Sequence, residues 1–224
     1  MLEEVYHQLS SSSNKIFVAV AGNIGSGKTT LTRKLSERLE WIPHYESVAD
    51  NPYLADFYGD MSKWSFQLQT YFLNHRFNTH RQIEVSSCSA IQDRSIYEDA
   101  HIFARALFEQ GDMDARDYEN YNRLYQSMIQ FLRPPTLMIF LRRSVPKLME
   151  RIHQRGRDYE QSISYDYLTR LNQYYDEWYD QYEAGNALVI QTDELDFLDN
   201  EAHFNLLVGK MHDSIAQRDL FYQQ

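Results

Sequence analysis

Cysteine and long apolar runs are scarce in this chain of 224 residues. Cys88 is the only cysteine, so no disulfide can form within the chain, and a reducing compartment is expected. No apolar run approaches the roughly 18–20 residues of a membrane span, and the first residues lack the charge-then-apolar order of a signal peptide. We therefore expect a cytoplasmic protein with no membrane partner.

Positive charge is also in short supply. Lysine and arginine number 22 together against 32 aspartates and glutamates, which gives a formal net charge of -10. A general nucleic-acid binder normally carries a basic surface, so no nucleic-acid partner is expected. An acidic protein that binds an anionic nucleotide must gather its cations locally, so a cluster of arginines would mark such a site.

Short apolar segments alternate with helical patterns along the chain. Strands are expected at residues 15–21, 45–48, 89–93, 136–141 and 187–191, and helices at residues 28–39, 53–84, 97–131 (interrupted near Gly111) and 200–218. A further helix is expected from about residue 145, with the arginine cluster, and an aromatic-rich helix after it that runs to about residue 185. Such alternation is typical of an α/β fold with a parallel sheet covered on both faces. We expect one domain over residues 15–224, with a five-stranded parallel sheet flanked by helices, after a flexible lead-in of residues 1–14.

A glycine-rich segment follows the first of these strands directly. Residues 22–29 read GNIGSGKT and fit the phosphate-loop pattern G-x-x-x-x-G-K-[ST] without a mismatch. Glycines let backbone N–H groups converge on phosphate oxygens, Lys28 can reach the β- and γ-phosphates, and Thr29 can ligate Mg²⁺. The expected ligands are therefore ATP or GTP and Mg²⁺. The predicted donor-binding set here is Gly22, Asn23, Ile24, Gly25, Ser26, Gly27, Lys28, Thr29 and Thr30.

Other classes of phosphate-loop protein fit less well. A signalling GTPase would need a D-x-x-G element after a strand and an N-K-x-D base reader, but residues 93–96 read DRSI and no N-K-x-D occurs. ATP-driven motors place several apolar residues before a strand-end acid, whereas only Ala90 and Ile91 precede Gln92 and Asp93 here. The pattern favours a small-molecule kinase.

Several separated motifs, in one order, resemble those of the deoxynucleoside kinase family over nearly the whole chain. They are the phosphate loop, YESV at residues 45–48, WSFQLQT at 64–70, DRSIYED at 93–99 and the arginine-rich segment at 151–160. Within the family the chain most resembles the bacterial deoxyadenosine/deoxycytidine kinase (purine deoxynucleoside kinase) branch. The resemblance implies a P-loop kinase fold with an arginine-rich lid, ATP as the donor and a homodimer.

The resemblance assigns the chemistry to two strand ends. Glu46 would be the general base for the sugar 5′-hydroxyl, although Ser47 stands where the family usually has proline. Asp93 would help hold Mg²⁺ beside Thr29, and Arg94 would contact the reacting 5′ oxygen and the neighbouring phosphate. Glu46, Arg94 and Lys28 are thus the predicted catalytic residues.

The same resemblance implies a base-reading set. Gln69, Arg76 and Asp99 would contact the base edge, and the seven-residue spacing of the first two places them on one helix face. Phe103 would stack on the base, and Trp64 would help to wall the pocket, although both could equally be core aromatics. Deoxyadenosine is the favoured substrate, with deoxycytidine or deoxyguanosine possible.

The sugar and the phosphates have their own expected contacts. By the resemblance, Tyr58 and Glu160 would bind the sugar 3′-hydroxyl. Arg151, Arg155 and Arg157 form the local cationic cluster that an acidic nucleotide-binding protein needs, and they resemble the family's lid over the donor phosphates.

The sequence thus predicts an ATP-dependent kinase that converts a deoxynucleoside to its monophosphate in nucleotide salvage. The nearest alternative is a nucleoside monophosphate kinase of the thymidylate kinase type, which would need a further cationic subsite for the acceptor's own phosphate. Arg76 could be assigned to that subsite. The motifs at residues 64–70 and 93–99 favour the nucleoside kinase.

Overall fold

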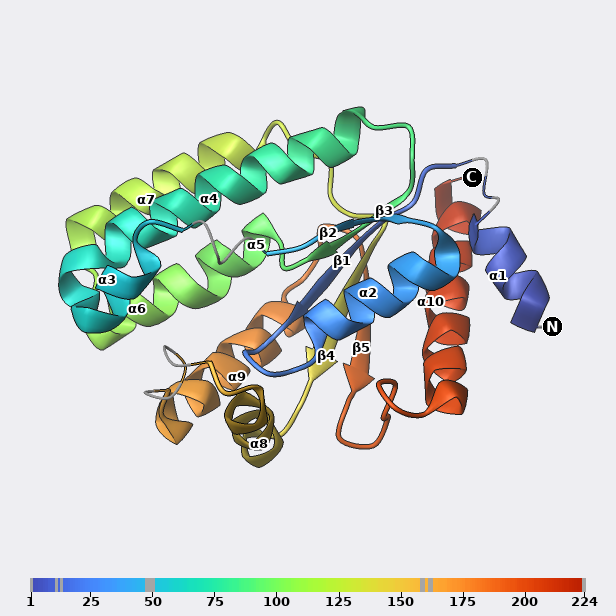
Figure 1. The fold of residues 1–224 in the computed structure, drawn as a ribbon. Helices are drawn as coiled ribbons and strands as arrows, with labels where there is room; N and C mark the ends of the chain where they lie inside the picture. The colour runs from blue at the N-terminus through green and yellow to red at the C-terminus, as the bar shows by residue number, and fades with distance from the viewer. Residues whose placement is uncertain are drawn as a thin grey trace.

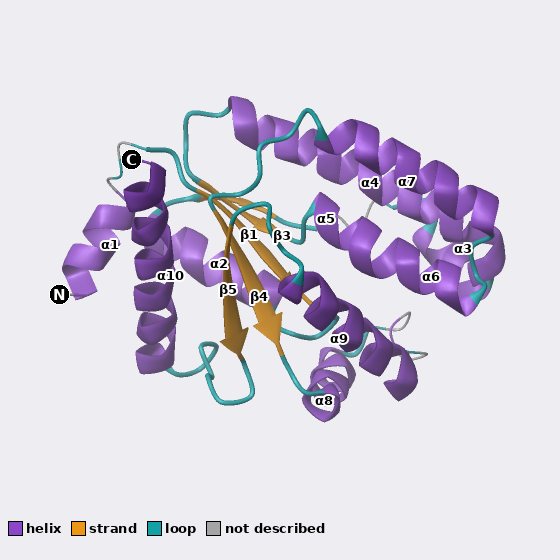
Figure 2. Cartoon of the chain, turned by 180° about the vertical axis from the view of Figure 1, so that it is seen from behind, coloured by secondary structure: helices purple, strands orange, loops and turns teal. Residues whose placement is uncertain are grey.

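A parallel β-sheet organises the molecule. The computed structural model describes residues 2–10, 12, 14–46, 51–157, 160 and 163–222, and in this part the sheet has five strands in the order β2-β3-β1-β4-β5 (Figure 1, Figure 2). The strands are β1 (Phe17–Gly22), β2 (Ile42–His44), β3 (Ala90–Asp93), β4 (Leu137–Arg142) and β5 (Asn186–Gln191). Every pairing is parallel. The predicted α/β class with a five-stranded parallel sheet is confirmed.

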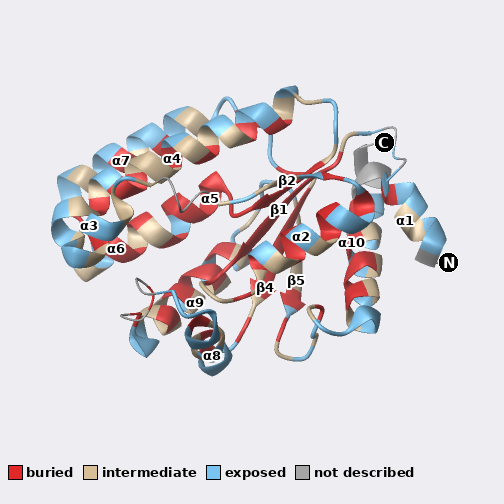
Figure 3. Ribbon diagram, in the orientation of Figure 1, coloured by how far each residue is buried: buried red, intermediate tan, exposed pale blue. Residues whose placement is uncertain are grey.

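Helices cover both faces of the sheet. They are α1 (Leu2–Ser10), α2 (Lys28–Leu39), α3 (Leu54–Gly59), α4 (Met61–Val85), α5 (Ile96–Glu98), the π-helix η1 (Asp99–Ala104), α6 (Arg105–Gln110), α7 (Ala115–Ile129), α8 (Val145–Arg155), α9 (Tyr165–Asp180) and α10 (Glu201–Tyr222). Side chains of β1 alternate between the two layers. Val18 and Val20 pack with α2 and α10, while Ala19 and Ala21 pack with α4, α7 and α9. Strands β1 and β3 are accordingly buried throughout, and β4 is buried except at its last residue, Arg142 (Figure 3).

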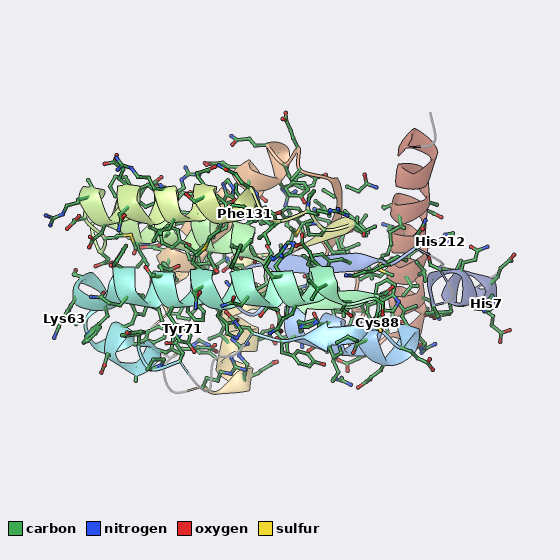
Figure 4. The ribbon with its side chains drawn as sticks, turned by 90° about the horizontal axis from the view of Figure 1, so that it is seen from above. His7, Lys63, Tyr71, Cys88, Phe131 and His212 are labelled. Atoms are coloured by element: carbon green, nitrogen blue, oxygen red, sulfur yellow. The ribbon has the colours of Figure 1, made fainter. Side chains whose placement is uncertain are left out.

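Two long helices extend well past the sheet. Seen from above, α4 and α7 lie side by side, with Lys63 near the start of α4, Tyr71 midway along it and Phe131 beyond the end of α7 (Figure 4). The free, exposed Cys88 lies at the opposite end of α4, in the connection to β3. None of the described helices is long and apolar enough to cross a membrane.

The structure has a helix where a flexible lead-in was expected. Residues of α1 pack against α2 and α10, Leu9 is buried in that contact, and the side chain of Gln8 hydrogen-bonds His212. Figure 4 shows His7 of α1 and His212 of α10 at the same end of the molecule. The amphipathic pattern of this segment is typical of a helix, but the polar composition of residues 1–14 led to the expectation of a flexible segment.

The predicted second strand at residues 45–48 is misplaced. The strand is β2, three residues earlier, where Ile42, Pro43 and His44 pair with β3; Tyr45 and Glu46 lie past its end, and residues 47 and 48 are outside the described part. Proline cannot donate a ladder hydrogen bond, which argues against a central strand but is tolerated at an edge. Because β2 is the edge of the sheet, Pro43 is accommodated there.

The predicted helix at residues 53–84 is divided into α3 and α4, whereas the interruption expected near Gly111 is confirmed. Asp60 separates α3 from α4, and its side chain caps α4 by accepting a hydrogen bond from Lys63 N at 3.1 Å. In the second region, α6 ends at Gly111, whose φ of 85° is the left-handed conformation that glycine adopts without strain. These breaks turn the chain back, so that α3 and α6 close one side of the cavity described next.

Candidate active site

The main cavity lies at the carboxyl ends of the strands, between the phosphate loop, α3–α4 and the segment after α8. Polar and apolar side chains both line it, as is typical of small-molecule sites. Residues from widely separated parts of the chain line it, because the ends of parallel strands meet at one edge of the sheet. The predicted site residues on its wall are Ile24, Gly25, Lys28, Thr29, Glu46, Tyr58, Gln69, Arg76, Arg94, Asp99, Phe103, Arg155, Arg157 and Glu160.

The phosphate loop has the backbone that its glycines permit. Gly25 and Gly27 have φ values of 82° and 102°, where an L side chain is strained. A Cβ on Gly22 would lie 2.7 Å from Leu141 O, so a side chain has no room there either. Helix α2 begins directly after Gly27, which leaves its first N–H groups facing the loop. This geometry suits an anion.

Lys28 is held inside the loop. Its Nζ donates hydrogen bonds to Gly22 O at 2.8 Å and Asn23 O at 3.0 Å, and the residue is only 6% exposed. Burial lowers the pKa of Lys28 to about 8, and the nearby charge of Arg94 adds to that effect. The ammonium group is therefore poorly compensated until an anion enters the cavity.

Thr29 and Asp93 meet beside the loop. The Thr29 hydroxyl donates to Asp93 Oδ2 at 2.5 Å, while Asp93 Oδ1 is buried without a hydrogen-bond partner among the described residues. Hydroxyl and carboxylate oxygens are the ligands that Mg²⁺ prefers. No cluster of three or more histidine, cysteine or acidic side chains suited to a metal occurs in the described part of the chain, so an ion here would need phosphate oxygens or water as its further ligands.

Glu46 is surrounded by cations. Its Oε1 accepts a hydrogen bond from Arg76 Nη2 at 2.6 Å and lies 3.3 Å from Arg94 Nε. Burial alone would raise the pKa of Glu46, but Arg94, Arg76 and Lys28 outweigh it and lower that pKa to about 2. The side chain is 23% exposed, so its remaining surface is open to a ligand in the cavity.

Arg94 has an unusual backbone conformation. Its φ of 68° is in the left-handed region, which costs a non-glycine residue on the order of 1–3 kcal/mol and is typical of functional sites. The backbone N of Arg94 bonds Val20 O at 3.0 Å, and the guanidinium group lies 4.3 Å from the centre of the Phe103 ring. The strained residue thus presents its charge to the cavity from a fixed position.

The far end of the cavity carries polar groups suited to a base. Gln69 is 4% exposed, and its Oε1 has no hydrogen-bond partner among the described residues. Arg76 Nε lies 2.7 Å from Asp99 Oδ2, as an ion pair without an aligned hydrogen bond. Burial raises the pKa of Asp99 to about 7 even though Arg76 and Arg94 oppose that shift. An amide, a guanidinium and a carboxyl group therefore meet at one end.

Arg155, Arg157 and Glu160 line the cavity near the phosphate loop. Arg155 Nη2 lies 2.6 Å from Glu160 Oε2, and Arg157 Nη1 lies 3.4 Å from Glu160 Oε1. Arg151 does not line the cavity. It packs against the phosphate loop instead, since its Cβ lies 3.7 Å from the point that a Cβ on Gly25 would occupy. Cationic side chains outnumber acidic ones on the described cavity wall, although the whole chain is acidic.

Comparison with known proteins now adds to this geometry. A family model described as deoxynucleoside kinase matches residues 18–216. The chain belongs to the deoxynucleoside kinase family. A deoxyadenosine/deoxycytidine kinase from Bacillus subtilis (strain 168) is 36% identical, over 87% of this chain and 90% of the relative. A deoxyguanosine kinase from Lactobacillus acidophilus is also 36% identical, over 89% and 91%. A solved deoxyadenosine kinase from M. mycoides with bound dATP superposes with a TM-score of 0.77 at 28% identity, over 88% of this chain and 98% of that one.

Membership of this family decides between the alternative classes. A GTPase switch and a thymidylate-type kinase were the competing interpretations. The family model that matches is that of deoxynucleoside kinases, which is neither of these classes. The structure gives a physical reason against the second. Arg76, the residue that could have bound an acceptor phosphate, is already paired with Glu46 and Asp99.

Not every predicted wall residue of this deoxynucleoside kinase lines the cavity. Trp64 packs against Tyr53, with ring centroids 5.9 Å apart, and belongs to the apolar cluster that also supplies the cavity wall, but it does not itself line the cavity. Thr30, which was predicted to bind the donor, follows Thr29 in α2 and does not line the cavity. Sequence reasoning missed the apolar and aromatic wall, because helical periodicity does not distinguish a core face from a cavity face. The missed residues are Leu54, Phe57, Leu68, Phe72, Leu107 and Tyr167.

Proposed function

We propose that this deoxynucleoside kinase transfers the γ-phosphoryl group of ATP to the 5′-hydroxyl of a deoxynucleoside, with deoxyadenosine as its favoured substrate. The observation that supports this most directly is the continuity of one cavity. It runs from Lys28 and Thr29 at the phosphate loop, past Glu46, to Gln69 and Asp99. A donor phosphate at one end and a base at the other would place the sugar 5′-hydroxyl beside Glu46.

Glu46 would orient the hydroxyl and then receive its proton. The bond from the 5′ oxygen to phosphorus forms while the bond from phosphorus to the β-phosphate oxygen breaks, and ADP leaves. A carboxylate with a pKa of about 2 is a weak base, but such transfers need little deprotonation in advance. Engagement of Lys28 and Arg94 with phosphate oxygens would offset their charges and raise the pKa of Glu46 at the moment it accepts the proton.

Thr29 and Asp93 are the residues proposed to hold Mg²⁺, directly or through water. The unpartnered Asp93 Oδ1 beside the Thr29 hydroxyl fits this assignment. The ion would neutralise charge on the β- and γ-phosphates when bound. Arg155 and Arg157 would bind the donor phosphates from the opposite side, while Tyr58 and Glu160 are proposed to contact the sugar 3′-hydroxyl. The homodimer stays a prediction.

The choice of base is proposed to depend on Asp99. As a carboxylate it accepts hydrogen bonds from the exocyclic amine of adenine or cytosine, and as a neutral acid it can donate one to the carbonyl of guanine. Because its pKa is raised to about 7, the acid form is abundant below neutral pH and the carboxylate above it. The enzyme would then discriminate between bases differently on the two sides of neutrality.

We expect the ratio of kcat/KM for deoxyadenosine over deoxyguanosine to rise roughly tenfold between about pH 6 and about pH 8, following ionisation of Asp99. Lys28, which acts on the phosphates, and Glu46, which acts on the 5′-hydroxyl, affect both substrates alike, so their effects cancel in the ratio. Initial rates across this pH range measure it. Asp99→Asn should give a ratio independent of pH, and a flat ratio in the unmodified enzyme would contradict the assignment.

The activity itself is tested by initial-rate assays with Mg²⁺ and either ATP or GTP. The acceptors are deoxyadenosine, deoxycytidine, deoxyguanosine, thymidine and thymidylate. Turnover of a purine deoxynucleoside or deoxycytidine with ATP is the expected result, with deoxyadenosine fastest. Phosphorylation of thymidylate alone would overturn the proposal.

A further inference from the structure

A buried carboxylate outside the predicted set connects three parts of the active site. Glu98 is completely buried at the end of α5. Its Oε1 accepts hydrogen bonds from the Tyr175 hydroxyl at 2.7 Å and from Gly22 N at 3.3 Å, and its Oε2 accepts one from Ser95 N at 2.9 Å. Within the described part of the chain, no lysine or arginine forms an ion pair with it. The hydrogen bonds of Glu98 in this part of the chain therefore all come from neutral donors.

Each of these donors belongs to a segment with a separate task. Gly22 opens the phosphate loop, Ser95 directly follows the strained Arg94, and Tyr175 lies in α9, behind the arginine-rich segment. Strained conformations persist only where the surroundings fix them. The peptide N of Arg94 is tied to Val20 O in β1, and the next peptide N is tied to Glu98, so both neighbouring peptides hold the left-handed residue.

We propose that Glu98 is a positioning residue that keeps Arg94 aligned with the phosphate loop and with α9. This inference rests on the proposed function, because alignment matters only if Arg94 acts on the reacting oxygen and phosphate. A displacement of about 1 Å at a reacting centre can cost on the order of 10² in rate. Loss of Glu98 should therefore lower kcat while leaving deoxynucleoside binding largely intact.

Glu98→Gln is the sharpest substitution, since it keeps the size of the side chain. Its amide group must replace one carboxylate oxygen, and whichever way it turns, Gly22 N–H or Ser95 N–H then faces a second donor. We expect kcat to fall about ten- to a hundredfold, with KM for deoxyadenosine changed less than about threefold. Tyr175→Phe removes a single hydrogen bond and should lower kcat by about two- to tenfold.

Tyr174→Phe is the matched control. Tyr174 is the neighbouring residue in α9, but its hydroxyl bonds Glu109 on the outer side, away from the phosphate loop. Its removal should leave kcat unchanged. A loss of kcat in Tyr174→Phe equal to that in Tyr175→Phe would indicate a general effect of α9 stability and would overturn the positioning role.

A double-mutant cycle separates positioning from stability. If Glu98 acts through Arg94, Glu98→Gln should add little to the loss of kcat in Arg94→Ala, measured by single-turnover phosphoryl transfer. Fully multiplicative losses, or an unchanged kcat with only a lower melting temperature in Glu98→Gln, would overturn the proposal. An unmodified chain that phosphorylates no deoxynucleoside would instead overturn the proposed function, and this inference with it.

Discussion

Replacing Glu46 by glutamine is expected to lower kcat for deoxynucleoside phosphorylation by roughly 10²–10⁴, the usual contribution of a positioned general base. Glutamine keeps the shape of the side chain and one oxygen that can accept the hydrogen bond from Arg76, but it cannot receive a proton. KM for the deoxynucleoside should change little, because the base-end residues Gln69 and Asp99 are not altered. Steady-state kinetics with deoxyadenosine and ATP/Mg²⁺ gives both constants.

The same substitution should also affect stability in a pH-dependent way. The pKa of Glu46 in the folded protein, about 2, lies below its ordinary value of 4.5, so the ionised group stabilises the fold at neutral pH. That contribution is fully present above about pH 4.5 and is lost as the pH falls through about 2. Glu46→Gln should therefore lower the melting temperature at neutral pH, since Arg76 and Arg94 lose the charge of their partner.

Glu109→Gln is the appropriate control for the loss of a carboxylate. Glu109 forms an ion pair with Arg105 at 2.7 Å, near the surface and away from the cavity wall. Its replacement should leave kcat within about twofold of the parent enzyme, as expected for an exposed ion pair. An equal and small loss of kcat in both variants would mean that Glu46 has no part in proton transfer.

The phosphate loop could be located from sequence because its chemistry is local. Eight consecutive residues specify both the loop and the start of the next helix, and the predicted helix at residues 28–39 matches α2 in both bounds. The second strand was misplaced for an equally local reason. Pro43 interrupts the apolar pattern, and only the sheet order shows that its strand is at an edge.

Contacts between distant residues were out of reach of such reasoning. Glu98 and Tyr175 are 77 positions apart, and the sequence around each of them does not indicate that they share a hydrogen bond. The apolar wall was missed for a related reason. Phe72 lies at helical spacing from other apolar residues of α4, as a core residue would. The break at Asp60 folds α3 back over α4, and this arrangement makes the face of α4 that carries Phe72 a wall of the cavity.

Replacing Lys28 by methionine should lower kcat by about 10²–10³, the typical cost of removing one preorganised donor to a developing charge. Methionine fills the buried space, but it cannot neutralise the transferred phosphoryl group. Lys34→Met is the matched control. Lys34 is in the same helix, but its Nζ bonds the backbone oxygens of Phe197 and Leu198 and does not face the cavity. A similar kcat in the two variants would contradict the role of Lys28.

The lowered pKa of Lys28 also predicts that the protein takes up protons when the donor nucleotide binds. Burial lowers its pKa to about 8 in the free protein, so roughly half of the molecules lack this proton at about pH 8. The charge of a bound triphosphate favours the protonated form and raises the pKa, so binding should take up close to half a proton at that pH. Titration calorimetry in two buffers of different ionisation enthalpy measures this uptake as a difference in apparent binding enthalpy. Equal enthalpies in the parent enzyme, or an uptake that persists in Lys28→Met, would show that the proton goes elsewhere.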